Sequence, residues 1–419
     1  MGKSTFLTGS IPTDARKPQR KNLLLRLQVD MVLLVAVIFL IVIGILMVYS
    51  SSWLFSLWND RPTSYIPLRQ MIFIAAGSVA VLVLSRFDYH WFQRLALPMM
   101  ITALLLLVAV LFIGDLRFSA TRTLFNGSIQ PSELSKLVII IYLSIWLYSK
   151  GSRLNSVTIG LLPMILILGI TAGLIFLQPD LSAAATIFIL GGLMFYFAGG
   201  DIRQILLVVI ISLIVGASVF SAHPTGQKRI TEYWEGTQSI ENLNYHTQLS
   251  FAAIIRGGFF GVGIGNGQGK FSGLPVPWTD SIFAVIVEEI GLIGAVFVII
   301  LYMVFMWRGF LIAQQAPDQL GRLLASGMTA WIAFEALVNM AVMVQLIPFA
   351  GNALPLISYG GSNMVTILLA IGVIMSVSHT GNTNKDSPER KKYGAIVDLR
   401  WWNRRRSVSR SDRSKGAGS

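Results

Sequence analysis

The sequence contains no cysteine, and only 13% of its 419 residues are Asp, Glu, Lys or Arg. The missing cysteines exclude disulfide bonds, thiolate metal sites and a cysteine nucleophile. The shortage of charge is as informative, because an ordinary soluble domain is about one quarter charged. Hydrophobic residues make up 54% of the chain instead. These proportions exclude an ordinary soluble globular protein.

The hydrophobic residues occur in blocks long enough to cross a lipid bilayer, whose hydrocarbon core requires roughly 20 helical residues. The block from Met31 to Ser50 has no charge and no polar face. It follows a long polar segment and precedes many other apolar blocks, so we interpret it as a transmembrane helix rather than a cleaved signal peptide. Ten spans are predicted, at residues 31–50, 68–84, 96–113, 133–148, 157–177, 181–199, 203–222, 281–307, 323–347 and 363–378.

The predicted fold is therefore an all-α polytopic integral membrane protein of about ten transmembrane helices, with both termini on one side. A long extracytoplasmic loop, residues 223–280, joins spans seven and eight, and its aromatic and apolar residues predict ordered helices at the membrane surface. The predicted divisions are a basic cytoplasmic tail (1–29), a transmembrane domain (30–379) and a disordered basic cytoplasmic tail (380–419).

The net charge of +13 lies mostly in the tails, because residues 1–30 carry +4 and residues 380–419 carry +7. Basic segments that flank membrane spans favour the cytoplasmic side and attract anionic lipid headgroups. This pattern predicts a multi-pass membrane protein with both termini in the cytoplasm. It also favours membrane lipids over nucleic acid as the partner of the run Arg404–Arg406.

Polar residues gather at the predicted outer ends of the spans, where each needs a partner or a wet cavity. Glu133 and Lys136 stand three residues apart at the start of span four, so they share a helix face and can pair. Asp180 stands in the turn before span six, where it can cap the helix or project into a cavity. For both places, a structural role and a substrate-contact role remain open.

Span eight begins with Asp280, again either an N-cap or a functional carboxylate, and carries Glu288 and Glu289 about two turns deeper. Carboxylates running inward from an outer mouth indicate a wet cavity. Glu335 and Asn339, four residues apart in span nine, are more typical of polar contacts that hold helices together than of catalytic residues. A transporter places broken helices near the midplane, and no span is interpreted as broken there, which favours an enzyme at the outer surface.

Five motifs resemble those of the SEDS family, which includes FtsW, RodA and SpoVE, across residues 30 to about 378. Residues 348–351, Pro-Phe-Ala-Gly, are similar to the division members, FtsW. In contrast, His246 stands where many members have glutamine. The motifs are Gln130-Pro-Ser-Glu-Leu-Ser-Lys136, Gln178-Pro-Asp-Leu181, Arg256-Gly-Gly-Phe-Phe-Gly-Val-Gly-Ile-Gly-Asn266, Thr279-Asp280 with Glu288-Glu289-Ile-Gly291, and Leu354-Pro-Leu-Ile-Ser-Tyr-Gly-Gly-Ser362.

The resemblance implies a peptidoglycan glycosyltransferase that polymerises lipid II at the outer face of the bacterial cytoplasmic membrane. It implies no organic cofactor and allows a divalent cation, Mg²⁺ or Mn²⁺. It implies Asp280 as the catalytic carboxylate, acting as a base or as a metal ligand. It also implies lipid II and undecaprenyl-linked glycan as substrates, a class B penicillin-binding protein as partner, and other divisome proteins. The candidate substrate-binding residues are Arg122, Glu133, Lys136, Asp180, Lys228, Arg229, Arg256, Lys270, Ser358, Gly360 and Gly361.

Two other functions fit parts of the sequence. A lipid II flippase, or another transporter of lipid-linked precursors, would use the same substrate and a similar cavity. It would need a polar path through both leaflets, whereas the predicted inner half is nearly uncharged. A division scaffold without catalysis would use the basic tails for docking, and it leaves Asp280 unexplained.

Overall fold

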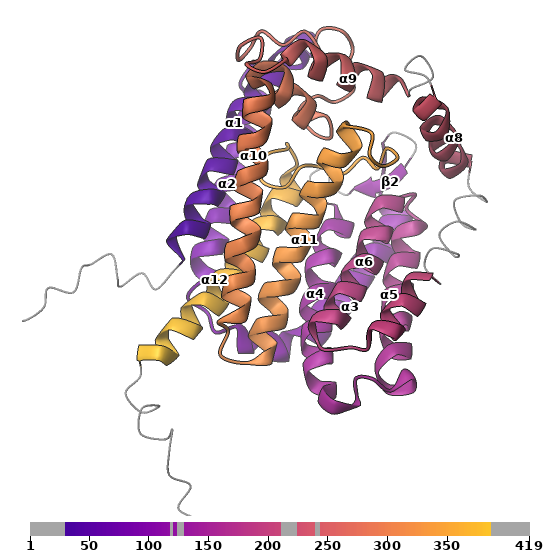
Figure 1. The fold of residues 1–419 in the computed structure, drawn as a ribbon, viewed down its shortest axis with the longest axis vertical. Helices are drawn as coiled ribbons and strands as arrows, with labels where there is room; N and C mark the ends of the chain where they lie inside the picture. The colour runs from indigo at the N-terminus through magenta and orange to yellow at the C-terminus, as the bar shows by residue number, and fades with distance from the viewer. Residues whose placement is uncertain (1–29, 118–119, 124–129, 211–223, 239–243, 387–419) are drawn as a thin grey trace, which may run out of the picture.

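The computed structural model describes residues 30–117, 120–123, 130–210, 224–238 and 244–386 (Figure 1). The described chain is helical apart from a short antiparallel hairpin of β1 (Asp115–Arg117) and β2 (Ala120–Thr123). Helices dominate because they satisfy every backbone polar group within one segment, as a lipid environment requires. The predicted all-α polytopic fold is confirmed, and the hairpin is an addition that lies in a predicted outer loop.

The helices follow one another with short connections. The short turns are η2 (Tyr89–Trp91), η3 (Gly151–Arg153) and the π-helical η4 (Val157–Leu161). The longer helices are α1 (Met31–Trp58), α2 (Tyr65–Leu84), α3 (Phe92–Ile113), α4 (Pro131–Lys150), α5 (Leu162–Phe176), α6 (Leu181–Phe197), α8 (Pro224–Gln238), α9 (Tyr245–Gly257), α10 (Ile282–Gln314), α11 (Gln319–Met343) and α12 (Gly361–Asp386).

Within the described ranges, eight helices are long and apolar enough to cross a membrane, and α6 is a shorter apolar helix. These nine match nine of the predicted spans. The remaining span, predicted at 203–222, is helical over residues 202–210, and its other residues lie outside the described part. Helix α12 continues to Asp386, into the segment predicted as a disordered tail from residue 380. The tails 1–29 and 387–419 also lie outside the described residues.

Helix α11 forms the centre of the bundle and packs against α4, α6, α10 and α12 (Figure 1). Most residues in the apolar segments of α4, α11 and α12 are buried, whereas most of those in α1, α2 and α3 face outward. An outward face of this kind is apolar because it meets lipid rather than water. The polar residues of α4, α11 and α12 are therefore shielded from the bilayer by the surrounding helices.

Helices α8 and α9 and the hairpin lie at one end of the bundle, at the top of Figure 1, which we call the α9 end. The two helices confirm that the predicted outer loop 223–280 contains ordered helical segments. At the opposite end, α1 begins and α12 ends. There Arg308 of α10 pairs with Asp30, whose side chain also caps α1 by accepting from the Leu33 backbone N–H at 3.0 Å.

Helix α10 is interrupted at Gly291, which has φ 80° and ψ −173°. The break frees the backbone carbonyls of Glu288 and Glu289, and these accept from the N–H groups of Val262 and Gly263 at 2.9 and 3.0 Å. The sequence showed no broken span, and α10 is broken, although not in its middle. Its break lies in the first third of the helix, on the side of the α9 end, and a loop fills it.

Candidate functional site

Two loops meet at the α9 end, one leading into α10 and the other joining α11 to α12. The Tyr359 backbone N–H donates to the Trp278 carbonyl at 2.8 Å. The Ser358 hydroxyl donates to the Thr279 carbonyl and accepts from the Leu354 N–H, both at 2.7 Å. Both hydrogen bonds occupy the Ser358 side chain, which is 3% exposed. Ser358 therefore joins the two loops, and its contact with substrate stays a prediction.

Asp280 lies at this junction and is partly exposed. Its Oδ2 faces the open backbone of Gly351, where a Cβ atom would lie 3.5 Å away. Gly351 has φ +62°, a conformation that favours glycine. The N-cap of α10 is Ser281 rather than Asp280, and it makes no side-chain capping bond. Asp280 therefore precedes the cap position of α10, and its partly exposed carboxylate lies at the junction of the two loops.

Asn339 of α11 connects both loops from beneath. Its side-chain N–H₂ group donates to the Asp280 carbonyl at 2.8 Å and to the Asn352 carbonyl at 2.6 Å. The sequence favours a polar contact between helices for Asn339, whereas its two acceptors are loop carbonyls. It therefore fixes the backbone on both sides of the Asp280 carboxylate.

A buried charge cluster lies one turn deeper on α11. Lys136 donates to Glu133 at 2.8 Å, which confirms the predicted pairing, and it also forms an ion pair with Glu335. Asn363 at the start of α12 donates to the other Glu133 oxygen at 3.0 Å. The ammonium of Lys136 lies 5.6 Å from the centre of the Trp331 ring. The cluster thus ties α4, α11 and α12 together.

Asp180 has the structural role that the sequence offered for it, and its contact with substrate stays a prediction. It caps α6 by accepting from the Ala183 N–H at 3.3 Å. Its other oxygen accepts from Gln130 at 3.3 Å and from Ser132 at 3.4 Å, so it also belongs to the polar group at the start of α4. Asp180 is only 4% exposed. The structure therefore brings Glu133, Lys136 and Asp180 to the same end of the bundle as Asp280.

Glu288 and Glu289 do not line a water-filled cavity, because a glycine-rich loop, residues 258–270, covers them. Glu288 accepts from the backbone N–H groups of Gln268 and Gly269 at 2.9 and 3.0 Å. Glu289 accepts from the Ser50 hydroxyl at 2.7 Å and from the Gly265 N–H at 3.0 Å. Both carboxylates are almost completely buried. The prediction of a wet cavity beside them is wrong, since donors from the loop compensate their charge.

Two of the predicted substrate-binding residues, Lys270 and Arg256, pair with these buried carboxylates. Lys270 has a side chain only 1% exposed and pairs with Glu289 at 3.0 Å, while it also donates to the Gly265 carbonyl at 2.6 Å. The Lys270 ammonium thus compensates the charge of Glu289, and its predicted contact with substrate stays a prediction. Arg256 donates to Glu288 at 3.3 Å but keeps 35% of its side chain exposed.

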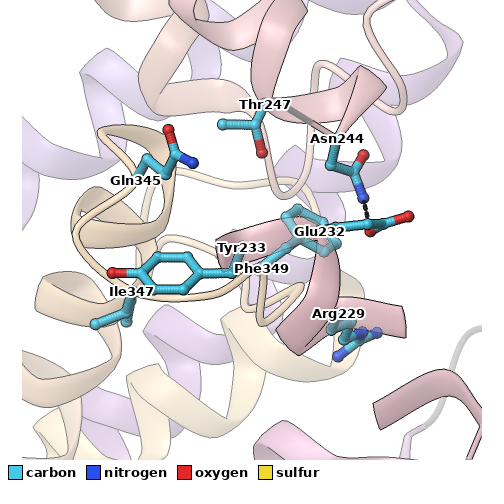
Figure 2. A pocket seen from close by; sticks show the side chains of 8 residues that line it. All are labelled: Arg229, Glu232, Tyr233, Asn244, Thr247, Gln345, Ile347 and Phe349. Carbon is cyan, nitrogen blue, oxygen red and sulfur yellow. Dashed lines mark hydrogen bonds between the residues drawn. The ribbon is translucent and has the colours of Figure 1, made fainter. Parts of the chain in front are cut away.

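Arg229 of α8 lines a small pocket of about 20 Å³ at the α9 end (Figure 2). Its guanidinium carbon is 5.9 Å from the centre of the Phe349 ring. In the same lining, Asn244 donates to Glu232 at 2.5 Å, and the Tyr233 hydroxyl donates to the Leu346 carbonyl at 3.2 Å. These bonds hold α8 against α9 and against the loop that follows α11.

Four other predicted residues are placed less directly. Lys228 belongs to α8 and Arg122 to β2, and the structure does not describe their side chains. Gly361 begins α12 and packs so closely on Phe73 of α2 that a Cβ atom would lie 2.5 Å from the ring. Gly361 therefore allows the close packing of α12 on α2, and its predicted substrate role stays a prediction. Gly360 is partly exposed beside Asn363.

His246 of α9 reaches the residue next to Asp280. Its Nε2 lies 2.9 Å from the Ser281 hydroxyl, and its ring centre lies 4.4 Å from that of Phe349, with the two rings tilted at 54°. Burial lowers the pKa of His246 to about 4. The imidazole is therefore neutral at physiological pH, and it supports the junction without adding charge to it.

A divalent cation fits this site poorly as an all-protein site. Among the described residues, no group of three or more His, Cys, Asp or Glu side chains could hold a metal ion. Asp280 is the candidate carboxylate, and Mg²⁺ sites of this kind rely on one or two carboxylates together with substrate phosphates. A cation here would therefore need substrate oxygens to complete its shell.

Sequence reasoning overlooked Asn363 and undervalued Asn339. Asn363 follows the Tyr-Gly-Gly-Ser motif directly, and its place in the first turn of a helix at the α9 end was the available signal. Nothing in the spacing of Asn339 could show that its acceptors are carbonyls 59 and 13 residues away.

Comparison with known proteins identifies the family. The model of the FtsW/RodA/SpoVE family, described as cell cycle proteins, matches residues 31–383. The chain belongs to this family. It is 38% identical over 355 residues to a probable peptidoglycan glycosyltransferase FtsW of Trichlorobacter lovleyi, covering 83% of this chain and 93% of the relative. It is 33% identical to stage V sporulation protein E of Bacillus subtilis, covering 83% and 96%.

Solved structures support the same fold. A chain of a peptidoglycan synthase complex that coordinates polymerization and crosslinking matches with a TM-score of 0.70 at 24% identity, covering 84% of this chain and 98% of that one. The rod shape determining protein RodA of Thermus thermophilus matches with a TM-score of 0.62, covering 84% and 96%. The chain is therefore a multi-pass membrane protein with the FtsW/RodA/SpoVE fold.

Proposed function

We propose that this chain is a peptidoglycan glycosyltransferase that polymerises lipid II into glycan strands at the outer face of the cytoplasmic membrane during cell division. The observation that carries the proposal is the Asp280 carboxylate, partly exposed at a loop junction fixed by Asn339 and Ser358. The names of the FtsW relatives support the same activity.

The proposed reaction joins two lipid-linked sugars. The 4-hydroxyl of one sugar attacks the anomeric carbon of the other, and undecaprenyl pyrophosphate leaves with inversion. Asp280 accepts the proton of the attacking hydroxyl as general base, a role that requires a carboxylate within hydrogen-bond reach of substrate. Gly351, which has no side chain, faces the Oδ2 atom of this carboxylate.

Positive charge near the pyrophosphate would stabilise the leaving group. Lys136 is unsuited to direct contact, because it is 4% exposed and lies between two carboxylates. Arg256 and Arg229 are better placed, since both keep part of their side chains exposed at the α9 end. Arg122 and Lys228 stay predicted contacts. We assign Glu133, Lys136 and Asp180 to holding the floor of the site.

The lipid tail of the substrate has a matching surface. An apolar groove of about 860 Å³ lies between α1, α2 and the glycine-rich loop. Its lining is almost entirely apolar, as a polyprenyl chain requires. The main lining residues are Leu46, Tyr49, Trp53, Leu68, Met71 and Ile264.

A divalent cation is proposed only as a co-ligand of substrate, held by Asp280 together with pyrophosphate oxygens. When bound there, it would neutralise charge on the leaving group. The proton transfer and the fixed loop geometry described above belong to the chain itself.

A class B penicillin-binding protein is the proposed partner, supported by the fold match to a chain from a peptidoglycan synthase complex. It would supply crosslinking. Other divisome proteins and anionic membrane lipids are proposed partners of the basic tails, which we place in the cytoplasm.

Flipping of lipid II is the competing function, and the broken helix α10 is the feature that favours it. However, the loop 258–270 fills the break, and Glu288 and Glu289 are buried beneath it. A sealed break does not offer the polar path that flipping requires. Polymerisation therefore remains the better account of the site.

The test is a polymerisation assay with purified protein and labelled lipid II, with and without the class B penicillin-binding protein. Wild-type protein should form glycan strands, and Asp280→Asn should lose them while its thermal stability stays close to wild type. Thr329→Val is a matched control, because the Thr329 hydroxyl bonds only to the Ala325 carbonyl of its own helix at 2.7 Å. Strands from Asp280→Asn at the wild-type rate, or movement of lipid II across vesicles without strands, would overturn the proposal.

A further inference from the structure

The side chain of Asn339 is 1% exposed and lies under the two loops that flank Asp280. Its Nδ2 donates to the carbonyls of Asp280 and Asn352 at 2.8 and 2.6 Å. Both hydrogens of the amide are therefore used. This arrangement fixes which side-chain atom is nitrogen, since an oxygen in that place would face two carbonyl oxygens.

The two acceptors belong to the two loops that meet at Asp280. One is the carbonyl of Asp280 itself, and the other belongs to the residue after Gly351, whose open backbone faces Asp280 Oδ2. The buried amide thus joins the loops at the two positions nearest the carboxylate, whereas the bonds of Ser358 and Tyr359 join them elsewhere. Loss of this amide would loosen the backbone at Asp280 and Asn352.

Asn339 is itself rigidly held. Glu335, one helical turn earlier on α11, pairs with Lys136, which is tied to Glu133 of α4. The Asn339 side-chain oxygen is buried and has no hydrogen-bond partner among the described residues. A buried amide that leaves its acceptor unsatisfied costs stability. A hydrophobic residue would therefore suit α11 better if helix packing were its only purpose.

We propose that Asn339 is a positioning residue for Asp280, holding its carboxylate at the geometry needed to accept the proton from the attacking sugar hydroxyl. This inference rests on the proposed function of Asp280. Supporting residues of this kind act by fixing the orientation of a catalytic group, and their loss typically lowers activity about 10- to 100-fold.

The first test compares the kinetics of Asn339→Leu with those of Thr329→Val on labelled lipid II. Asn339→Leu should lower kcat about 10- to 100-fold while KM changes less than about threefold, because the contacts to substrate remain. Thr329→Val, a buried polar-to-apolar change on the same helix, should retain kcat. Equal kcat for Asn339→Leu and wild type would overturn the positioning role, as would equal losses of kcat in both variants.

The second test uses Asn339→Asp, which keeps the side-chain size and remains informative if the leucine variant does not fold. The introduced carboxyl can donate one hydrogen bond only when it is protonated. The activity of Asn339→Asp relative to wild type should therefore fall as pH rises. A pH profile parallel to that of wild type would contradict the proposal.

The third test reports on the loop without requiring activity. A nitroxide attached to Ala353→Cys in the otherwise cysteine-free chain should be immobile with Asn339 present and clearly more mobile with Asn339→Leu. Equal mobility of the nitroxide in the two proteins would overturn the proposal that Asn339 holds this loop. If wild-type protein forms no strands, the proposed function fails while this measurement still decides whether Asn339 holds the loop. If wild type forms strands and Asn339→Leu matches it, the positioning role fails alone.

Discussion

Lys136 of α4 and Glu335 of α11 form an ion pair in the interior of the bundle, and Glu133 is a second carboxylate on the same lysine. All three residues are at most 8% exposed. One cation thus serves two acids in a place where an uncompensated charge is expensive. Loss of the lysine should therefore destabilise the protein far more than loss of one of the two carboxylates.

Lys136→Met should destabilise the protein strongly, by about 3–5 kcal/mol, because it leaves two buried carboxylates without their cation. Glu335→Gln should cost about 1 kcal/mol or less, because the remaining Lys136 and Glu133 still form a neutral pair. Thermal unfolding of both purified variants in the same detergent measures the difference. Similar losses of stability would contradict this account of the cluster.

The break in α10 should depend on Gly291. A Cβ atom at Gly291 would collide with the backbone of Phe259 and Gly261, and the φ of 80° disfavours any side chain. Gly291→Ala should therefore destabilise the protein by at least about 1–3 kcal/mol and release the glycine-rich loop. Limited proteolysis within residues 258–270 would report that release.

Gly173→Ala is the matched control for this variant. Gly173 lies within α5, where a Cβ atom would meet nothing within 4 Å. Alanine in the interior of a helix stabilises it by roughly 0.5–1 kcal/mol relative to glycine. If Gly173→Ala and Gly291→Ala changed thermal stability alike, the break at Gly291 would have no special role.

The sequence predicted the helical membrane fold well, because a long uncharged segment such as Met31 to Ser50 has few alternatives to a spanning helix. It also predicted the Lys136–Glu133 pair, since a spacing of three residues fixes a shared helix face. It could not place Lys270 or Glu289, because their contact depends on how a loop folds back over α10. For Asp280, the local sequence left a helix cap and a functional carboxylate open, and the structure places the cap of α10 at Ser281.

Acidification should weaken the protein through His246. The pKa of His246 is lowered by burial to about 4, below the ordinary value of 6.5. A histidine with a lowered pKa contributes its full stability above the unfolded value, and this stability is lost as pH falls toward the folded value. The loss should reach at most about 2 kcal/mol at pH 5.

Thermal unfolding between pH 8 and pH 5 measures this effect. His246→Gln should show a flatter decline of melting temperature than wild type, because glutamine does not titrate and can still bond to the Ser281 hydroxyl. The difference between the two profiles isolates the contribution of His246 from that of the carboxylates. Parallel profiles would show that His246 does not titrate differently on unfolding.

The orientation of the α9 end decides whether Asp280 faces the outer surface. Single cysteines can be introduced without background labelling, because the chain has none. Ser272 is exposed at the α9 end, and Ser149 is exposed near the opposite end of α4. A membrane-impermeant maleimide should label Ser272→Cys on intact spheroplasts but Ser149→Cys only after permeabilisation. The reverse pattern would place Asp280 on the cytoplasmic side, where polymerised strands could not join the cell wall.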